Sequence, residues 1–142
     1  MKKAITVLMI GAILVSSLSM CSLAAYEDEY MHQEIIEPRY EVISNVTAYL
    51  FISESGQAAC DASASTFPGY RVEILAELQR QEGRSWTTIR DWDGSGDDYA
   101  GASGYWYVMP GYSYRLKVTV TIYDSNGRII ESPVEYSKVE EY

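Results

Sequence analysis

The alternation of apolar and polar side chains from residue 40 onward constrains this 142-residue chain more than any other feature. From Tyr114 to Ile122 every second residue is apolar, and the residues between them are Arg, Lys or Thr. Shorter runs with the same period lie at 46–52 and 72–78. Successive side chains of a strand point to opposite faces of a sheet, so this period is typical of strands with one buried face. Because no window favours the period of a helix, we expect an all-β fold.

Turn-forming residues divide the alternating region into seven predicted strands. Gly or Pro lies at most of the breaks, at Ser55-Gly56, Pro68-Gly69, Gly83, Pro110-Gly111 and Asn126-Gly127. The predicted strands are 41–53, 57–66, 71–81, 85–92, 99–108, 112–124 and 128–137. At Asn126-Gly127 we expect a type I′ turn, since Asn and Gly both tolerate positive φ. Short strands with one apolar face each predict two packed antiparallel sheets, which is a β-sandwich.

One segment resembles a motif of fibronectin type III and related immunoglobulin-like domains. Residues 110–118 read P-G-Y-S-Y-R-L-K-V, which is similar to the P-G-x-x-Y-x-V/L-x-V run of those domains. The resemblance implies a seven-stranded antiparallel immunoglobulin-like β-sandwich. It also implies that Tyr114 forms the tyrosine corner, with its hydroxyl bonded to the backbone near the preceding turn.

The whole chain also resembles small secreted proteins of Gram-positive bacteria that have no assigned function. The similarity lies in the N-terminal leader, the Pro38-Arg39-Tyr40 segment, the hairpin from Leu78 to Trp92 and the strand at 112–123. This resemblance implies an extracellular location and the same fold. It brings no catalytic residues with it.

The first 24 residues have the three parts of a secretory signal peptide. Lys2 and Lys3 precede an apolar run, and small residues follow it, so we expect cleavage before Ala25. A secreted protein without membrane contact would result. The alternative is a membrane-anchored lipoprotein, because 18–21 resembles a lipobox ending in Cys21. We expect residues 25–39, which are acidic and aperiodic, to form a flexible arm, and residues 40–142 to form the β-sandwich domain.

Charge and cysteine content exclude several classes of function and stabilisation. The chain has 20 acidic and 11 basic residues and a net charge of −9, which repels phosphate backbones, so we expect no nucleic-acid partner. Only two cysteines are present, and Cys21 leaves with the leader or carries a lipid. An internal disulfide is therefore excluded, and we expect Cys60 to be a small buried apolar residue.

The sequence predicts no catalytic residue, no metal site and no cofactor. The only histidine, His32, lies in the arm, so a nucleophile in the domain would lack the usual base. The segment 91–98 begins like a calcium-binding loop, but its twelfth position would be Ala102 instead of a glutamate, and we expect an acidic, solvated hairpin tip. Two alternatives remain: a weak Ca²⁺ site in this loop, or a hydrolase using Asp91 and Asp93.

Outward-facing aromatic side chains are the candidate binding residues. If Leu50 points into the core, Tyr49 and Phe51 point outward, and if Trp106 points inward with Val108, Tyr105 and Tyr107 point outward. Aromatic residues also suit pleated surfaces without any ligand. The sequence favours a non-catalytic extracellular interaction module that binds a protein or cell-envelope ligand. The alternative is a carbohydrate- or cell-wall-binding protein that uses Tyr49, Phe51, Tyr105 and Tyr107.

Overall fold

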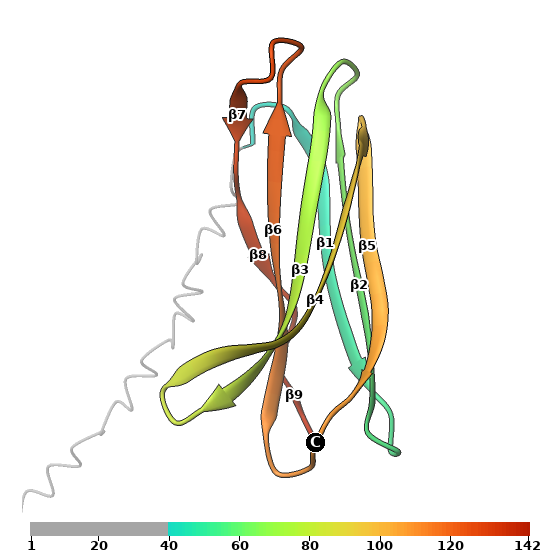
Figure 1. Ribbon diagram of the computed structural model, residues 1–142, viewed down its shortest axis with the longest axis vertical. Coiled ribbons are helices and arrows are strands. Elements are labelled where there is room, and N and C mark those ends of the chain that lie inside the picture. The colour runs from blue at the N-terminus through green and yellow to red at the C-terminus, as the bar shows by residue number, and fades with distance from the viewer. Residues whose placement is uncertain (1–39) are drawn as a thin grey trace, which may run out of the picture. The chain divides into compact units, whose positions relative to one another are not determined.

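The computed structural model describes residues 40–142, which consist of strands and turns (Figure 1). The predictions for the signal peptide at 1–24, for a lipidated Cys21 and for the arm at 25–39 lie outside these described residues. Among residues 40–142 there is no helix with the length and hydropathy needed to cross a membrane. The expectation of an all-β fold is confirmed.

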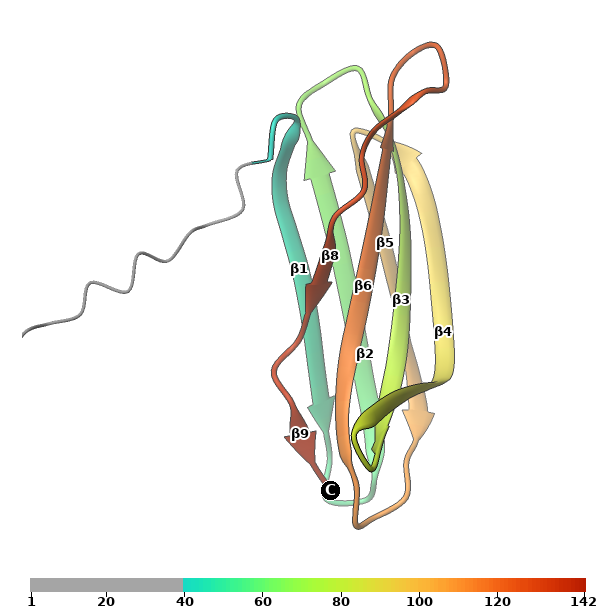
Figure 2. The ribbon, with the colours of Figure 1, turned by 90° about the vertical axis from the view of Figure 1, so that its left-hand side faces the viewer.

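Two antiparallel sheets face each other, as Figures 1 and 2 show. The small sheet has the order β1-β2-β5, with β1 at Ile43–Ile52, β2 at Gln57–Thr66 and β5 at Tyr99–Tyr107. The large sheet begins β4-β3-β6, with β3 at Arg71–Glu82, β4 at Ser85–Asp97 and β6 at Ser113–Tyr123. Its far edge consists of three short strands that all pair with β6: β7 (Ile129–Glu131), β8 (Val134–Tyr136) and β9 (Glu140–Glu141). The predicted β-sandwich is therefore confirmed.

The core lies between the two sheets, and the sheets contribute side chains of different size. The large sheet supplies bulky residues, and the side chains of Tyr114, Leu116, Val118 and Ile122 on β6 are fully buried. The small sheet supplies mainly small residues from β2 and β5: Ala58, Cys60, Ala62, Ala64, Ala100 and Ala102. Burial of the apolar area on the inner faces of the two sheets stabilises the sandwich, and Cys60, the cysteine of the described residues, forms no disulfide.

Cys60 and Tyr114 behave as the sequence predicts. Cys60 is 3% exposed, and burial raises the pKa of its thiol to about 12. The Tyr114 hydroxyl donates a hydrogen bond of 2.7 Å to the backbone carbonyl of Met109, just before the Pro110-Gly111 turn. A tyrosine corner is a hallmark of immunoglobulin-like sandwiches, so this contact supports that form of the fold.

The prediction of one continuous strand at 128–137 is wrong. It is divided into β7 and β8, because Pro133 lies between them and has no amide hydrogen to donate to the ladder. The amide of Ser137 then donates to the carbonyl of Leu116, and the Ser137 hydroxyl accepts from the amide of Leu116. Isolated contacts of this kind keep the chain beside β6 between the short ladders of β7, β8 and β9.

The type I′ turn expected at Asn126-Gly127 is also wrong. Only Gly127 has a positive φ, of 76°, whereas Asn126 does not. The carboxylate of Asp124 accepts hydrogen bonds from the amides of Asn126 (2.8 Å) and Arg128 (2.9 Å). These bonds stabilise a three-residue loop in which glycine takes the left-handed position.

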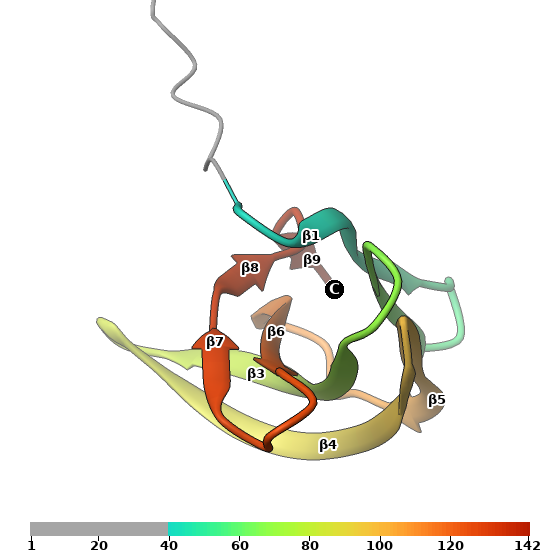
Figure 3. The ribbon, with the colours of Figure 1, turned by 90° about the horizontal axis from the view of Figure 1, so that it is seen from above.

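The segment 93–97 is not a hairpin tip but the end of β4, and Asp97 lies opposite Arg71 of β3. This loop-like sequence forms a strand by pairing with residues 71–75 of β3, and its glycines let another strand approach closely. A Cβ at Gly94 would lie 2.1 Å from the carbonyl oxygen of Gly101, and a Cβ at Gly104 would lie 2.0 Å from Nε1 of Trp92. Glycine thus lets β4 and β5 pass at close range where the chain crosses from one sheet to the other (Figure 3). We call Gly94, Gly96 and Gly104 the glycine seam.

Candidate functional site

The four predicted binding residues all lie on the outer face of the small sheet. Tyr49 and Phe51 come from β1 and are 57% and 51% exposed, and Tyr105 and Tyr107 come from β5 and are 69% and 68% exposed. Leu50 between the first pair is buried, as the alternation requires. The structure therefore brings onto one face residues that are more than fifty positions apart in sequence.

Strand β2 separates the two groups of aromatic side chains, because it pairs with β1 on one side and β5 on the other. In the register, Phe51 lies opposite Ala59, and Ala59 lies opposite Tyr105. In the next outward row, Tyr49 lies opposite Asp61, which lies opposite Ser103. We call this face the aromatic trough, because tall side chains on the outer strands flank a middle strand with shorter ones.

Sequence reasoning missed one member of the trough. Tyr99 begins β5, is 58% exposed and lies opposite Ser65 of β2. It has the same parity along the chain as Tyr105 and Tyr107, so the alternation that selected those two residues could have selected Tyr99 as well. The β5 side of the trough thus carries three tyrosines.

The floor of the trough is polar and nearly uncharged. The hydroxyls of Thr47 and Ser63 lie 2.8 Å apart across β1 and β2, and those of Ser44 and Ser65 lie 3.0 Å apart. Asp61 is the only charged residue in β1, β2 and β5. It is exposed, and it forms no hydrogen bond or ion pair with any residue that the structure describes.

Trp106 is not buried as the sequence argument assumed, since it is 41% exposed. It lies near the end of β5 on the face that should point inward, and the Arg90 guanidinium covers it at 5.0 Å from the ring centroid. The same guanidinium lies 6.0 Å from the centroid of Trp92. These distances are typical of cation–π contacts, so an arginine instead of the core covers this indole.

The outer face of the large sheet has paired charges. The Lys117 ammonium lies 2.8 Å from one carboxylate oxygen of Glu77. The other carboxylate oxygen accepts a hydrogen bond of 2.9 Å from the Thr88 hydroxyl. Burial alone would raise the pKa of Glu77, but hydrogen bonds from Lys117 and Thr88 and the charge of Lys117 leave it below the usual value. The carboxylate is therefore held ionised by its neighbours.

Aromatic side chains on this face are also occupied. The Arg115 guanidinium lies between two rings, 4.3 Å from the centroid of Trp86 and 4.2 Å from that of Tyr136. Its Nε donates a 2.9 Å hydrogen bond to the side-chain oxygen of Gln79. Little of this stack is free to recognise another molecule.

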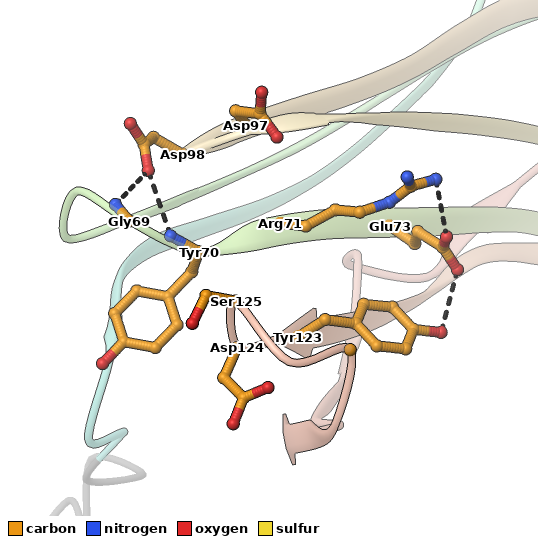
Figure 4. Close-up of a pocket in the computed structure, with 10 residues that line it drawn as sticks. Gly69, Tyr70, Arg71, Glu73, Asp97, Asp98, Tyr123, Asp124 and Ser125 are labelled. Atoms are coloured by element: carbon orange, nitrogen blue, oxygen red, sulfur yellow. Dashed lines mark hydrogen bonds and ion pairs between the residues drawn. The ribbon is translucent and has the colours of Figure 1, made fainter.

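A polar depression of about 710 Å³ lies where β3, the Asp98 corner and the loop after β6 meet (Figure 4). The carboxylate of Asp98, which has a φ of 62°, accepts the amide hydrogens of Gly69 (2.7 Å) and Tyr70 (3.3 Å). Glu73 pairs with Arg71 at 3.2 Å and accepts a 3.0 Å hydrogen bond from the Tyr123 hydroxyl. These carboxylates stabilise turns and strands, so the depression is a weaker candidate than the trough.

The alternatives based on the 91–98 segment receive no support from the geometry. Asp91 and Asp93 extend outward from a strand instead of converging in a loop. Asp93 borders a shallow open depression around Leu75, and Asp91 lies outside it. Within the described range 40–142, no group of three or more His, Cys, Asp or Glu side chains could hold a metal ion.

Comparisons with known proteins add little to this description. No protein-family model matches the chain, and no curated protein matches it. Among solved structures, the chain is similar to AggA, the major subunit of aggregative adherence fimbriae type I from Escherichia coli. The match has 12% identity and a TM-score of 0.32, and it covers 68% of this chain and 90% of that one. A TM-score of this size carries no argument, so the fold assignment rests on the strand order and register described above.

Proposed function

We propose that this chain is a non-catalytic interaction module that works outside the cell and binds a protein or cell-envelope ligand along the aromatic trough. One observation carries the proposal: five exposed aromatic side chains on one sheet face line both sides of β2, at positions 49, 51, 99, 105 and 107. Clustered exposed apolar area on a soluble domain marks interaction surfaces.

The chemistry of tyrosine supports the proposal. A tyrosine ring offers a large, stiff contact area with only two side-chain torsions to order on binding, and its hydroxyl can form a hydrogen bond. Tyr105 and Tyr107 follow each other on the same face of β5, and Tyr49 and Phe51 do so on β1. Because side chains two apart on a strand are about 6.7 Å apart, each pair forms a continuous wall.

The proposal also includes export of the chain from the cell. We propose that residues 1–24 are a removed signal peptide, that 25–39 are an arm and that 40–142 are the binding domain of a Gram-positive bacterial protein. The intact mass of the exported product tests this part. A start at Ala25 or Tyr26 supports release into the medium, whereas a diacylglycerol group on Cys21 supports a membrane-anchored lipoprotein instead.

A carbohydrate ligand is the second candidate, and the polar floor of the trough favours it. Gln57 and Ser63 face outward on β2, and Ser103 faces outward on β5 between Tyr99 and Tyr105. Sugar rings have apolar faces that stack on aromatic rings and hydroxyls that form hydrogen bonds with amides and hydroxyls. A trough with aromatic walls and a hydroxyl-bearing floor suits both needs.

Co-sedimentation with purified Gram-positive cell wall tests the proposal. We expect the double variant Tyr49→Ser, Tyr105→Ser to lose retention by about tenfold or more, because exposed tyrosines dominate such contacts. The control is Val134→Ser, Tyr136→Ser, which removes two exposed apolar side chains from the outer face of the large sheet.

Treating the purified cell wall before the assay identifies the class of ligand. Retention that is lost after protease treatment indicates a protein ligand, and retention that survives and recurs on purified polysaccharide indicates the carbohydrate alternative. If the trough variant sediments like the unmodified chain, or if neither is retained, the proposed function is wrong.

A further inference from the structure

Asp61 introduces one negative charge into an otherwise neutral binding face. It lies on β2 with Tyr49 opposite on one side and Ser103 opposite on the other. Neither neighbour can neutralise a carboxylate, and β1, β2 and β5 contain no lysine or arginine. The charge is therefore available to a ligand.

Ala59 is the outward residue that precedes this carboxylate on β2. Its side chain is the shortest among the outward residues of β2, and Phe51 and Tyr105 stand directly opposite it on the two neighbouring strands. Two strand spacings separate the backbones of Phe51 and Tyr105 by about 9.6 Å, so a group centred above Ala59 is about 5 Å from the backbone line of each outer strand, within reach of both side chains. A cation interacts favourably with an aromatic ring within about 6 Å of its centroid.

Aromatic clusters elsewhere in the molecule already hold cations of the chain itself. Arg80 lies over Tyr112, Arg90 lies over Trp106, and Arg115 lies between Trp86 and Tyr136. Within residues 40–142, no arginine or lysine lies over a ring of the trough. Among the described residues, the trough is thus an aromatic surface that no cation of the chain covers, and it is open to a cation of a ligand.

We infer that the trough recognises a lysine ammonium group carried by an extended segment of a partner protein, with the ammonium above Ala59, between Phe51 and Tyr105 and beside Asp61. This inference rests on the proposed function and specifies the ligand chemistry of the same site. A compact ammonium on an unbranched stem fits between the aromatic side chains of β1 and β5, and its stem can pack on the rings. The net charge of −9 also attracts a basic partner over a longer range.

A charge-matched pair of variants tests the inference. The full chain, labelled with ¹⁵N, is titrated with the peptide acetyl-Gly-Ser-Lys-Ser-Gly-amide and with the same peptide acetylated on the lysine Nζ. Asp61→Asn removes the proposed contact, and Asp93→Asn removes an exposed carboxylate from β4 on the other sheet, so both raise the net charge equally. Only a specific contact distinguishes them.

We expect the lysine peptide to shift the amide signals of Ala59, Asp61 and Tyr105 with saturation, and the acetylated peptide not to do so. Asp61→Asn should weaken binding about threefold or more, and Asp93→Asn should leave it within about 1.5-fold of the original value. Equal weakening by both variants, equal binding of both peptides, or no saturable shift overturns the inference. Retention on cell wall is read out separately, so the proposed function can stand when this inference fails.

Discussion

The two outer faces of the sandwich both carry aromatic side chains, but they differ in the charged residues around them. On the large sheet, Glu77 pairs with Lys117, and Arg115 is held between Trp86 and Tyr136. On the small sheet, aromatic walls flank β2, and Asp61 has no partner among the described residues. On the first face these rings and charges contact one another, whereas on the second the aromatic rings and Asp61 have no charged partner among the described residues.

This difference shows that an exposed aromatic residue is not in itself a sign of binding. Tyr136 is 49% exposed, close to the 51% of Phe51, yet an arginine of the same chain occupies its ring. Exposure identifies candidates, and the absence of an internal partner selects among them. The predictions below compare matched positions on opposite sides of the sheets, beginning with the largest expected effect.

Thiol labelling compares the inner and outer faces of β2. Cys60 is buried, and the pKa of its thiol is raised to about 12, so at pH 8 its alkylation should be about 1,000-fold slower than that of an exposed cysteine. In a Cys60→Ala background, Ser63→Cys places a thiol on the trough floor, and it should react at the exposed rate. Mass spectrometry of iodoacetamide-treated protein measures both rates. Similar rates would show that the inner face opens readily.

Alanine at two glycines of β5 compares the seam with the trough. A Cβ at Gly104 would overlap the indole of Trp92, so Gly104→Ala should lower the free energy of unfolding by about 2–3 kcal/mol. At Gly101 a Cβ would meet only the end of the Tyr99 side chain at 3.1 Å, and Gly101→Ala should cost less than about 1 kcal/mol. Urea unfolding measures both. Equal costs would contradict the close approach of β4 and β5.

The substitution of tyrosine by phenylalanine separates a structural hydroxyl from a free one. Tyr114→Phe removes the buried hydrogen bond to Met109 and should lower the free energy of unfolding by about 1–1.5 kcal/mol. Tyr105→Phe removes an exposed hydroxyl and should change it by less than about 0.5 kcal/mol. Thermal unfolding followed by circular dichroism measures both effects. An effect of Tyr105→Phe as large as that of Tyr114→Phe would contradict the distinction between a structural hydroxyl and a free one.

Acid titration compares the carboxylates of the two faces and should give the smallest effect. The pKa of Glu77 is lower in the folded chain than its usual value of 4.5. The ionised carboxylate therefore stabilises the fold fully above pH 4.5, and this contribution is lost as the pH falls through the lowered pKa of the folded chain. Glu77→Gln should cost about 0.5–1 kcal/mol at pH 7 and reduce the loss of stability between pH 5 and pH 3. Asp61→Asn, which removes no internal contact, should change the stability at pH 7 by less than about 0.5 kcal/mol. Urea midpoints measured from pH 3 to pH 7 check both.

Much of the fold is predictable because alternation directly reports which face of a strand is buried. The runs at 46–52, 72–78 and 114–122 fall within β1, β3 and β6, and the side chains expected inside on β6 are all buried. The tyrosine corner at Tyr114 is predictable for another reason, because residues 110–118 resemble a motif of fibronectin type III and immunoglobulin-like domains in which that tyrosine has this role.

Two errors have different physical causes. The Gly-rich run 93–97 has a composition of low strand propensity, yet it forms the end of β4 because it pairs with residues 71–75 of β3, and its glycines let β5 pass close to it. The segment 128–137 has strand-forming residues, yet Pro133 and the Ser137 contacts with Leu116 interrupt its ladder. The first error depends on pairing with the distant strand β3, whereas the proline behind the second is present in the sequence itself.

The trough is only partly predictable. The alternation predicts that Tyr49, Phe51, Tyr105 and Tyr107 point outward, and the structure agrees. It does not predict that β1 and β5 flank β2, because strand neighbours are set by long-range pairing. The positions of Ala59 and Asp61 between the aromatic walls follow only from the register, which the sequence does not reveal.

The glycine seam limits which sequences can share this architecture. A methyl group at position 94 or 104 would overlap a backbone carbonyl or an indole ring, so these positions accept no other residue without a shift of β4 against β5. The trough has no such restriction, since its side chains contact mainly solvent. Related sequences with this architecture should therefore keep glycine in the seam while the trough residues vary with the partner. Glycines at these spacings should be the positions that change least.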